Sequence, residues 1–294
     1  FLWGFFILCQ IPVMFNHPKI QFLRNRFILV LIPRIMVAIF IILQIIGMMV
    51  YPGGTIHDEA TVGYSFSNNF FSDLGIYTAY NGEPNYLSMS LFMISLILVG
   101  ITFIFYYMTL PQFYKQDSLN FKLSILGTLF AFGGSIGLIG TALTPADLVL
   151  DMHVFFANGI FKCFMITALC YTIVISRSNV FEKKYAWGYG VFFILIAWFV
   201  NVLEWPPPPR SSQSALVFQV ITQKLIVLTF CLAIVYQTFG VSKSKILLWL
   251  LFDQKLTYCT VFFNFSKLFH FNWVEINKGD MNHLTLFRVI NRII

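Results

Sequence analysis

Six long apolar segments constrain the fold of this chain more than any other feature of its sequence. Each has 18 or more residues with few charges, the length that a helix needs to cross the hydrocarbon core of a bilayer. Lipid offers no partner for backbone N–H and C=O groups, so each segment is predicted to be helical. The segments cover residues 32–51, 87–110, 122–143, 154–175, 186–203 and 215–238.

The composition agrees with a membrane protein and disagrees with a water-soluble one. Hydrophobic residues make up 58% of the chain and charged residues only 11%, whereas a soluble domain carries roughly 25% charged residues. The polar residues are too few to coat a water-soluble globule of 294 residues. We therefore predict an all-α, polytopic integral membrane bundle of six transmembrane helices.

Charged residues sort the connecting segments into two alternating sets. The acidic set covers 52–86, 144–153 and 204–214, where Arg210 is the one basic residue. By the positive-inside rule the other set is cytoplasmic, and both ends of the bundle lie on that side. Because the basic residues form short clusters rather than one patch, no nucleic-acid partner is predicted. The basic clusters contain Lys19, Arg24, Arg26, Lys115, Lys122, Arg177, Lys183, Lys184, Lys243 and Lys245.

One membrane domain accounts for most of the chain. The apolar residues 1–15 are compatible with part of an additional span. In the tail, Asp253 and Lys255 interrupt an apolar run, and each costs about 2.5–3.5 kcal/mol at a helix centre. We therefore favour an interfacial helix, or a non-native extension, over a seventh span. The predicted divisions are an N-terminal segment 1–31, the six-span domain 32–238 and a C-terminal tail 239–294.

The third apolar segment carries a stripe of small residues. Gly133 and Gly137 form a GxxxG spacing, which lets a neighbouring helix approach closely. We favour packing inside the bundle over a dimer interface, because a six-helix bundle needs such contacts in any case.

Unusual polar residues gather toward the outer ends of the predicted helices. Lys162 and Lys224 lie roughly 12–14 Å inside their spans, where an unpaired charge is costly. We predict a polar cavity open to the outer face, with the lysines at its floor and carboxylates at its rim. The alternative is that the lysines snorkel or bond backbone carbonyls. The candidate ligand-binding residues are Asp73, Asp147, His153, Glu204, Gln219, Lys224 and Lys162.

Metal binding and hydrolysis are both compatible with these residue types, but no sequence motif supports either. His57, Asp73 and His153 are weak candidates for metal ligands, since no HxxxH or HExxH spacing supports them. No metal or other cofactor is predicted. Ser72 with His153 and an acid could form a hydrolytic triad. More simply, Ser72 and Asp73 predict the N-cap of a short helix.

The stretch GYSFSNNFFSDLG at residues 63–75 is too aromatic for a solvated linker and too polar for a span. It predicts a segment at the bilayer boundary. Its aromatic residues are expected in the interfacial belt, and its Asn, Ser and Asp residues are expected to face inward or cap the next turn.

Several of these runs resemble a known family. NNFFSDLG after the first span, NYLSMSLF at the start of the second, and GLIGTALTPAD with DMHVFFA across spans three and four are similar to a six-span membrane family catalogued as domain of unknown function 998. Through NVLEW at 201–205 the chain more distantly resembles the DRAM-type membrane proteins, whose members are linked to lysosomal, Golgi and lipid-anchor biology. The resemblance implies the six-span fold and no activity. It places on the family's pattern Asn69, Ser72, Asp73, Gly75, Pro145, Asp147 and His153.

Three functions are compatible with these features. The first is a non-enzymatic membrane protein that binds or moves a membrane lipid or small anionic solute in the outer cavity, where the lysines suit an anionic group. The second is a membrane-embedded lipid hydrolase that uses Asp, His and Ser at the outer face. The third is a structural or regulatory subunit. We favour the first, because enzyme motifs are absent and intramembrane charge is present.

Overall fold

The fold is known from a computed structural model, which describes residues 26–205 and 207–244. Six helices in this part of the chain are long and apolar enough to cross a membrane. They confirm the predicted all-α, multi-pass membrane bundle. The segments interpreted as an additional span (1–15) and as an interfacial helix (246–294) lie outside the described residues.

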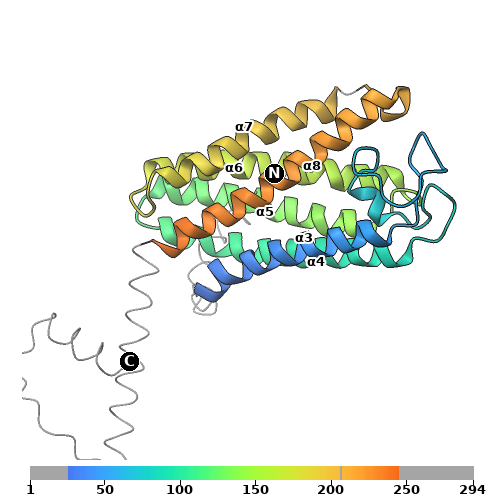
Figure 1. Cartoon of the computed structure of the whole chain (residues 1–294). Helices are drawn as coiled ribbons and strands as arrows, with labels where there is room; N and C mark the ends of the chain where they lie inside the picture. The colour runs from blue at the N-terminus through green and yellow to red at the C-terminus, as the bar shows by residue number, and fades with distance from the viewer. Residues whose placement is uncertain (1–25, 206, 245–294) are drawn as a thin grey trace, which may run out of the picture. The chain divides into compact units, whose positions relative to one another are not determined.

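The helices follow one another with short connections at most turns (Figure 1). The first span begins earlier than predicted, at Phe27, because a π-helical turn (Phe27–Leu31) runs directly into the α-helix. Pro33 lies in the first turn of that α-helix, where a missing N–H is tolerated. The elements are η1 (Phe27–Leu31) with α3 (Ile32–Val50), η2 (Ser72–Gly75), α4 (Tyr86–Thr109) with η3 (Leu110–Tyr114), α5 (Ser118–Leu143), α6 (Leu150–Arg177), α7 (Lys184–Glu204), η4 (Pro209–Ser211) and α8 (Gln213–Ser242).

Two helices begin at side-chain caps that the sequence supplies locally. The Asp117 side chain accepts a hydrogen bond from the backbone N–H of Asn120 at 2.9 Å, and α5 follows. The Ser212 hydroxyl accepts from the backbone N–H of Ala215 at 3.2 Å, and α8 follows. Each cap satisfies an N–H group that has no partner inside its helix.

The six helices form a closed ring in chain order. Each helix packs against the next one, and α8 returns to pack against α3. A ring of six helices leaves space along its axis, which side chains from all six must fill. Large aromatic residues do most of this filling, and the fully buried ones include Tyr106, Tyr107, Tyr171, Phe103, Phe164 and Phe199.

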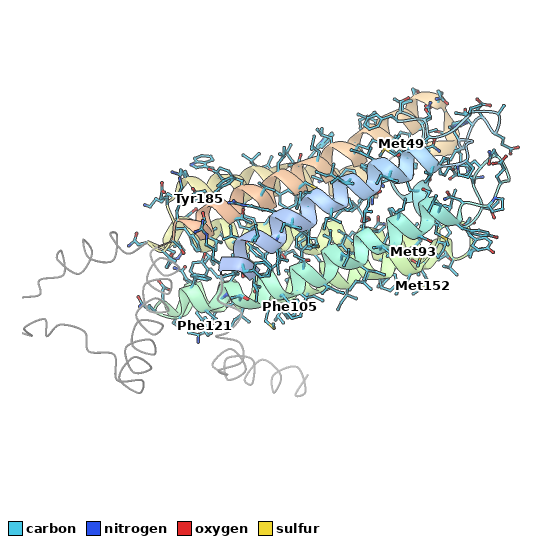
Figure 2. The ribbon with its side chains drawn as sticks, turned by 60° about the horizontal axis from the view of Figure 1, so that its bottom comes forward. Met49, Met93, Phe105, Phe121, Met152 and Tyr185 are labelled. Carbon is cyan, nitrogen blue, oxygen red and sulfur yellow. The ribbon has the colours of Figure 1, made fainter. Side chains whose placement is uncertain are left out.

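Apolar side chains also cover the outside of the ring. Met49 and Met152 are exposed toward one end of the bundle, and Phe105 is exposed nearer the other end (Figure 2). A water-soluble protein rarely exposes so much contiguous apolar surface. This apolar mantle is the surface that the lipid chains of a bilayer would cover.

The two ends of the ring differ in their connections. We call the end that carries residues 51–85, together with the α5–α6 and α7–α8 connections, the outer end, and the opposite end the inner end (Figure 1). These names follow the orientation that the charge pattern predicts. Residues 51–85 are called the outer cap below.

The outer cap is built on hydrogen bonds rather than on regular structure. Its one helical element is the short 3₁₀ turn η2. Asn85, just before α4, donates from Nδ2 to the carbonyl oxygens of Leu74 at 3.0 Å and Ile76 at 2.9 Å. The Ser88 hydroxyl donates to the Leu74 carbonyl oxygen at 3.1 Å. These bonds fix η2 to the beginning of α4.

Gly54 is required where the outer cap folds against itself. Its φ is +82°, and a Cβ there would lie 2.5 Å from the carbonyl carbon of Tyr80. We expect Gly54→Ala to lower the free energy of unfolding by about 2 kcal/mol, because strain and a backbone clash combine. Gly82, with a φ of +85° and open space around it, is the matched control. Gly82→Ala should cost about 1 kcal/mol from backbone strain alone.

Thermal unfolding in detergent and limited proteolysis of the outer cap measure both variants. Equal losses of Tm for Gly54→Ala and Gly82→Ala would contradict the role given to the Tyr80 contact.

The GxxxG residues serve packing inside the bundle, as predicted. A Cβ at Gly133 would lie 2.9 Å from Sγ of Cys163, and a Cβ at Gly137 would lie 3.0 Å from the carbonyl oxygen of Phe156. Both neighbours are on α6. The small residues therefore allow α5 and α6 to come close enough for side chain to meet backbone.

Candidate functional site

A narrow cavity runs along the axis of the ring. It has a volume of about 120 Å³ and is lined by residues of all six helices and of the outer cap. On α4 the lining extends from Phe92 to Phe103, which is about 16 Å of helix at 1.5 Å per residue. Most voids in protein interiors are smaller than a water molecule. A cavity of this length has room for an extended aliphatic chain.

The lining of the cavity changes from polar to apolar along the axis. Its polar residues lie in the outer half of the bundle: Ser72 in the outer cap, Gln44 on α3, Thr141 on α5, His153 on α6 and Gln223 on α8. The lining nearer the middle of the bundle is aromatic and aliphatic. The cavity therefore has a polar end at the outer cap and a hydrocarbon-like interior.

Phenylalanine rings close the inner part of the cavity. Phe230 of α8 contacts Phe103 of α4, Phe164 of α6 and Phe192 of α7, with ring centroids 5.3, 4.7 and 5.2 Å apart. Such edge and tilted contacts are favourable between aromatic rings. Four helices thus meet in one aromatic cluster, which forms the apolar floor.

Two polar atoms on buried cavity-lining residues have no hydrogen-bond partner in the described chain. Gln44 is 3% exposed, and its Nε2 donates to the Ser95 hydroxyl at 2.7 Å while its Oε1 is unpaired. Thr141 is 5% exposed, and its hydroxyl is also unpaired. Leaving such an atom unsatisfied costs about 1–3 kcal/mol. Both residues also line the cavity.

His153 presents one ring nitrogen as an acceptor. Its Nδ1 lies 2.6 Å from the backbone carbonyl oxygen of Thr144. A carbonyl oxygen can only accept, so Nδ1 donates, and Nε2 of the neutral ring is an acceptor. The bond from the first turn of α6 to the end of α5 also fixes the orientation of the ring.

Gln223 holds the outer cap over the polar end of the cavity. Its Oε1 accepts a hydrogen bond from the backbone N–H of Phe71 at 2.8 Å. Phe71 and Ser72 line the cavity as a result. The aromatic residues of the stretch 63–75 were expected in the interfacial belt. Three of them, Tyr64, Phe66 and Phe71, lie near Lys224, and of these only Phe66 is largely exposed.

Asp147 is a clamp for the outer cap rather than a rim carboxylate. Its two carboxylate oxygens accept from the backbone N–H groups of Tyr77 at 2.8 Å and Thr78 at 2.9 Å. Asp147 does not line the cavity. Both of its oxygens instead accept from backbone N–H groups of the cap.

Lys224 is buried, at 6% exposure, but it is not among the residues that line the cavity. Its Nζ donates to the backbone carbonyl oxygen of Asn69 at 2.5 Å. The rings of Tyr64, Phe66 and Phe71 surround the ammonium group, with centroids 5.0 to 5.3 Å away. The alternative in which the lysine bonds a carbonyl is confirmed. The prediction of Lys224 at a cavity floor is wrong, because cation–π contacts and the carbonyl stabilise its charge elsewhere.

Lys162 pairs with Glu204, and both side chains are about half exposed. The distance from Nζ to Oε1 is 2.5 Å, and the pair joins α6 to α7. The pair gives the Lys162 charge a partner, and Lys162 does not line the cavity, so the predicted position at a cavity floor is wrong. Lys162 follows His153 by nine residues, or two and a half helical turns, so the two side chains leave α6 on opposite sides.

Asp73 is buried inside the outer cap. One carboxylate oxygen accepts from the backbone N–H of Phe70 at 2.8 Å and from Asn69 Nδ2 at 3.3 Å, and the other accepts from the Tyr80 hydroxyl at 3.4 Å. Burial raises the pKa of Asp73 to about 6, although these hydrogen bonds oppose the rise. The same carboxylate adds to the effect of burial in raising the pKa of Tyr80. Asp73 thus organises the interior of the cap.

The predicted N-cap formed by Ser72 and Asp73 is wrong. No side chain caps η2, which Phe71 precedes. Asp73 lies inside the turn, so its carboxylate reaches back to the N–H of Phe70. Ser72 lines the cavity instead.

The metal hypothesis is also wrong for the part of the chain that the structure describes, where no group of three or more His, Cys, Asp or Glu residues could hold a metal ion. His57 is exposed, and its Nε2 bonds the carbonyl oxygen of Pro209 at 2.9 Å. Asp73 is enclosed in the cap, and His153 lies at the cavity.

Ser72 and His153 do line the same cavity, but they do not form a triad. No hydrogen bond joins them within residues 26–205 and 207–244, and Nδ1 of His153 binds a carbonyl oxygen rather than a carboxylate. A triad needs the acid on that nitrogen to hold and stabilise the imidazole.

Two of the predicted residues support the cap from within. Asn69 is completely buried; its Oδ1 accepts from the Ser65 N–H at 2.9 Å and its Nδ2 donates to the Gly54 carbonyl oxygen at 3.0 Å. Gly75 lies against Phe92, where a Cβ would meet the ring Cε1 at 2.6 Å. Both residues therefore contribute to the packing and hydrogen bonding of the cap.

Gln219 and Pro145 shape the other outer connections. Gln219 donates to the carbonyl oxygen of Pro207 at 2.5 Å, so it holds the α7–α8 connection and is not a cavity residue. The carbonyl oxygen of Pro145 accepts from the N–H groups of Leu148 and Val149, at 3.1 and 3.0 Å, in the turn before α6.

Two cavity residues were missed in the sequence. Gln44 had a signal, because it is the one amide side chain in the apolar run IPRIMVAIFIILQIIGMMVY. Thr141 had none, because a helical threonine usually bonds a carbonyl oxygen of its own helix. In the structure, however, the Thr141 hydroxyl makes no such hydrogen bond within the described residues.

Comparisons with known proteins find no match: no family model, no curated protein and no solved structure matches this chain. The resemblance to the six-span family therefore stays a prediction, and the function has to be argued from the cavity itself.

Proposed function

We propose that the protein binds a membrane lipid or similar amphiphile inside the bundle, with one aliphatic chain in the axial cavity. The observation that carries this proposal is the change from a polar lining under the outer cap to an aromatic floor near the middle of the helices. Burial of an aliphatic chain there is favourable by about 0.8 kcal/mol per methylene group when the competing environment is water. In a bilayer the competing environment is also apolar, so the fit of the chain and its polar contacts have to make the cavity more favourable than the surrounding lipid.

An anionic solute has less support than a lipid. Both lysines that suggested it have other partners, Asn69 for Lys224 and Glu204 for Lys162. A hydrolase has less support as well, because the Ser72 and His153 side chains lack the bonds of a triad. A purely structural subunit would have no use for unpaired polar atoms on cavity-lining residues.

The proposal predicts that filling the cavity abolishes chain binding. Ala157 of α6 lines the cavity, whereas Ala38 of α3 is exposed on the outside of the ring. The probe is a fourteen-carbon alcohol with a photoreactive diazirine near the end of its chain. In the unaltered protein it should label the peptides that contain Phe103 and Phe230. Ala157→Trp should reduce this labelling at least roughly tenfold, because the indole occupies the space of the chain.

Ala38→Trp adds the same volume outside the ring and should leave the labelling unchanged. Labelling confined to the outer surface, or equal in both variants, would overturn the proposal.

A further inference from the structure

We infer that the polar group of the bound amphiphile is uncharged and carries a hydroxyl or amide proton, as in a long-chain alcohol or a monoacylglycerol. The inference rests on the proposed lipid binding and adds the class of head group to it. Four side chains around the polar end of the cavity carry the inference: Gln44, Ser72, Thr141 and His153.

Two of these side chains need a proton donor. Gln44 uses its amide N–H₂ group on Ser95, so the atom left unpaired is Oε1, which can only accept. His153 uses Nδ1 on the Thr144 carbonyl, so Nε2 of the neutral ring can only accept as well. A ligand that satisfies either atom has to bring an O–H or N–H group.

The hydroxyls of Thr141 and Ser72 allow the site to bind a group that both donates and accepts hydrogen bonds. The Thr141 hydroxyl has no partner within the described chain and can rotate to donate or to accept. Ser72 supplies a second hydroxyl from the outer cap. A ligand hydroxyl carries one donor and can also accept, so it suits an acceptor such as Gln44 Oε1 and a donor such as the Thr141 hydroxyl.

The lining offers no cation to an anionic head group. Among the described residues that line the cavity there is no Lys, Arg, Asp or Glu. The nearest buried cation on α8, Lys224, is held by the Asn69 carbonyl and three aromatic rings. A carboxylate or phosphate brought here would lose its water without gaining a cation, and it would face the acceptor atoms of Gln44 and His153.

The test is a competition against the chain-labelled photoreactive alcohol in the full-length protein. The competitors share one fourteen-carbon chain and differ only in head group: tetradecanol, monomyristoylglycerol, tetradecyl phosphate and tetradecane. We expect the two uncharged hydroxyl compounds to reduce labelling at concentrations about tenfold lower than the phosphate or the alkane, as one or two hydrogen bonds would give.

Three variants connect that preference to the named residues. Gln44→Leu and Thr141→Val should each reduce the advantage of tetradecanol over tetradecane about fivefold. Thr102→Val on α4 is the matched control, because the Thr102 hydroxyl bonds only the Leu98 carbonyl in its own helix and does not line the cavity. It should leave the advantage unchanged. Both test substitutions nearly preserve side-chain volume, and labelling by the probe itself verifies that each variant is folded.

The possible outcomes distinguish a failure of the inferred head group from a failure of the proposed lipid binding. If the probe does not label the cavity peptides at all, the proposed lipid binding fails. If labelling occurs but tetradecyl phosphate or tetradecane competes as well as tetradecanol, or both variants keep the full preference, the chain is bound and the inferred head group is wrong.

Discussion

Replacing Gly137 with leucine is expected to lower the free energy of unfolding by about 3 kcal/mol, because the new side chain overpacks the α5–α6 interface. A Cβ at this position would lie 3.0 Å from the backbone carbonyl oxygen of Phe156 and 3.0 Å from Cγ1 of Ile160. A backbone oxygen cannot turn aside as a side chain can. The two helices would have to separate, and contacts along the whole of their shared length would loosen.

Gly159 on the neighbouring helix α6 provides the control for this prediction. A Cβ there would have no neighbour within 4 Å, so Gly159→Leu adds the same volume without a clash. Its effect should stay within about 0.5 kcal/mol. Unfolding of both variants in mixed micelles with increasing denaturing detergent measures the difference. A loss at Gly159 equal to that at Gly137 would refute the role of close helix approach.

Raising the pH from 4 to 7 is expected to lower the stability of the protein relative to its Asp73→Asn variant by about 2 kcal/mol. The folded-state pKa of Asp73 is about 6, above the ordinary value of 3.8, because the carboxyl is buried. A raised pKa means that the folded state holds the proton more tightly than the unfolded state does. The resulting stabilisation is fully present below pH 3.8 and is lost as the pH rises through about 6.

The Asp73→Asn variant is suited to this test because an amide keeps the key geometry. Its oxygen can still accept from the N–H of Phe70, and it has no charge to bury. The measurement is the difference in unfolding free energy between protein and variant at several pH values from 4 to 7.5. Glu59→Gln, at an exposed position in the same cap, is the control and should leave the pH dependence unchanged. A pH-independent difference between protein and Asp73→Asn would contradict the prediction.

The helices and their close packing could be predicted because each depends on residues that are near one another in the sequence. Apolar length and backbone hydrogen bonding in lipid leave a helix as the single outcome for each segment, and the described part of the chain contains six such helices. The glycine stripe of α5 was also predictable, because small side chains at GxxxG spacing occupy one face of a helix. Even the pairing of Lys162 with an outer acid followed from the cost of an isolated intramembrane charge.

The site could not be predicted in the same way, because it depends on which polar atoms find partners across long separations. The sequence marks Lys224 as anomalous, but its partner is the Asn69 carbonyl, 155 residues earlier in the chain. Asp147 was expected at a ligand site, yet two N–H groups of the outer cap use its carboxylate. Conversely, Gln44 matters because one of its atoms has no partner, which is visible only in the folded bundle.

Sequence alone therefore determined that the described part of this protein is a bundle of six membrane-spanning helices, since hydrophobic length and backbone hydrogen bonding act within each segment. The tertiary structure decided where its polar groups act. The outer cap places a carbonyl oxygen and aromatic rings beside Lys224, and α7 places a carboxylate beside Lys162. The ring of helices encloses a cavity lined by Gln44 and Thr141. The polar end of that cavity is made by uncharged hydrogen-bonding groups, because every nearby charge is stabilised by a partner elsewhere.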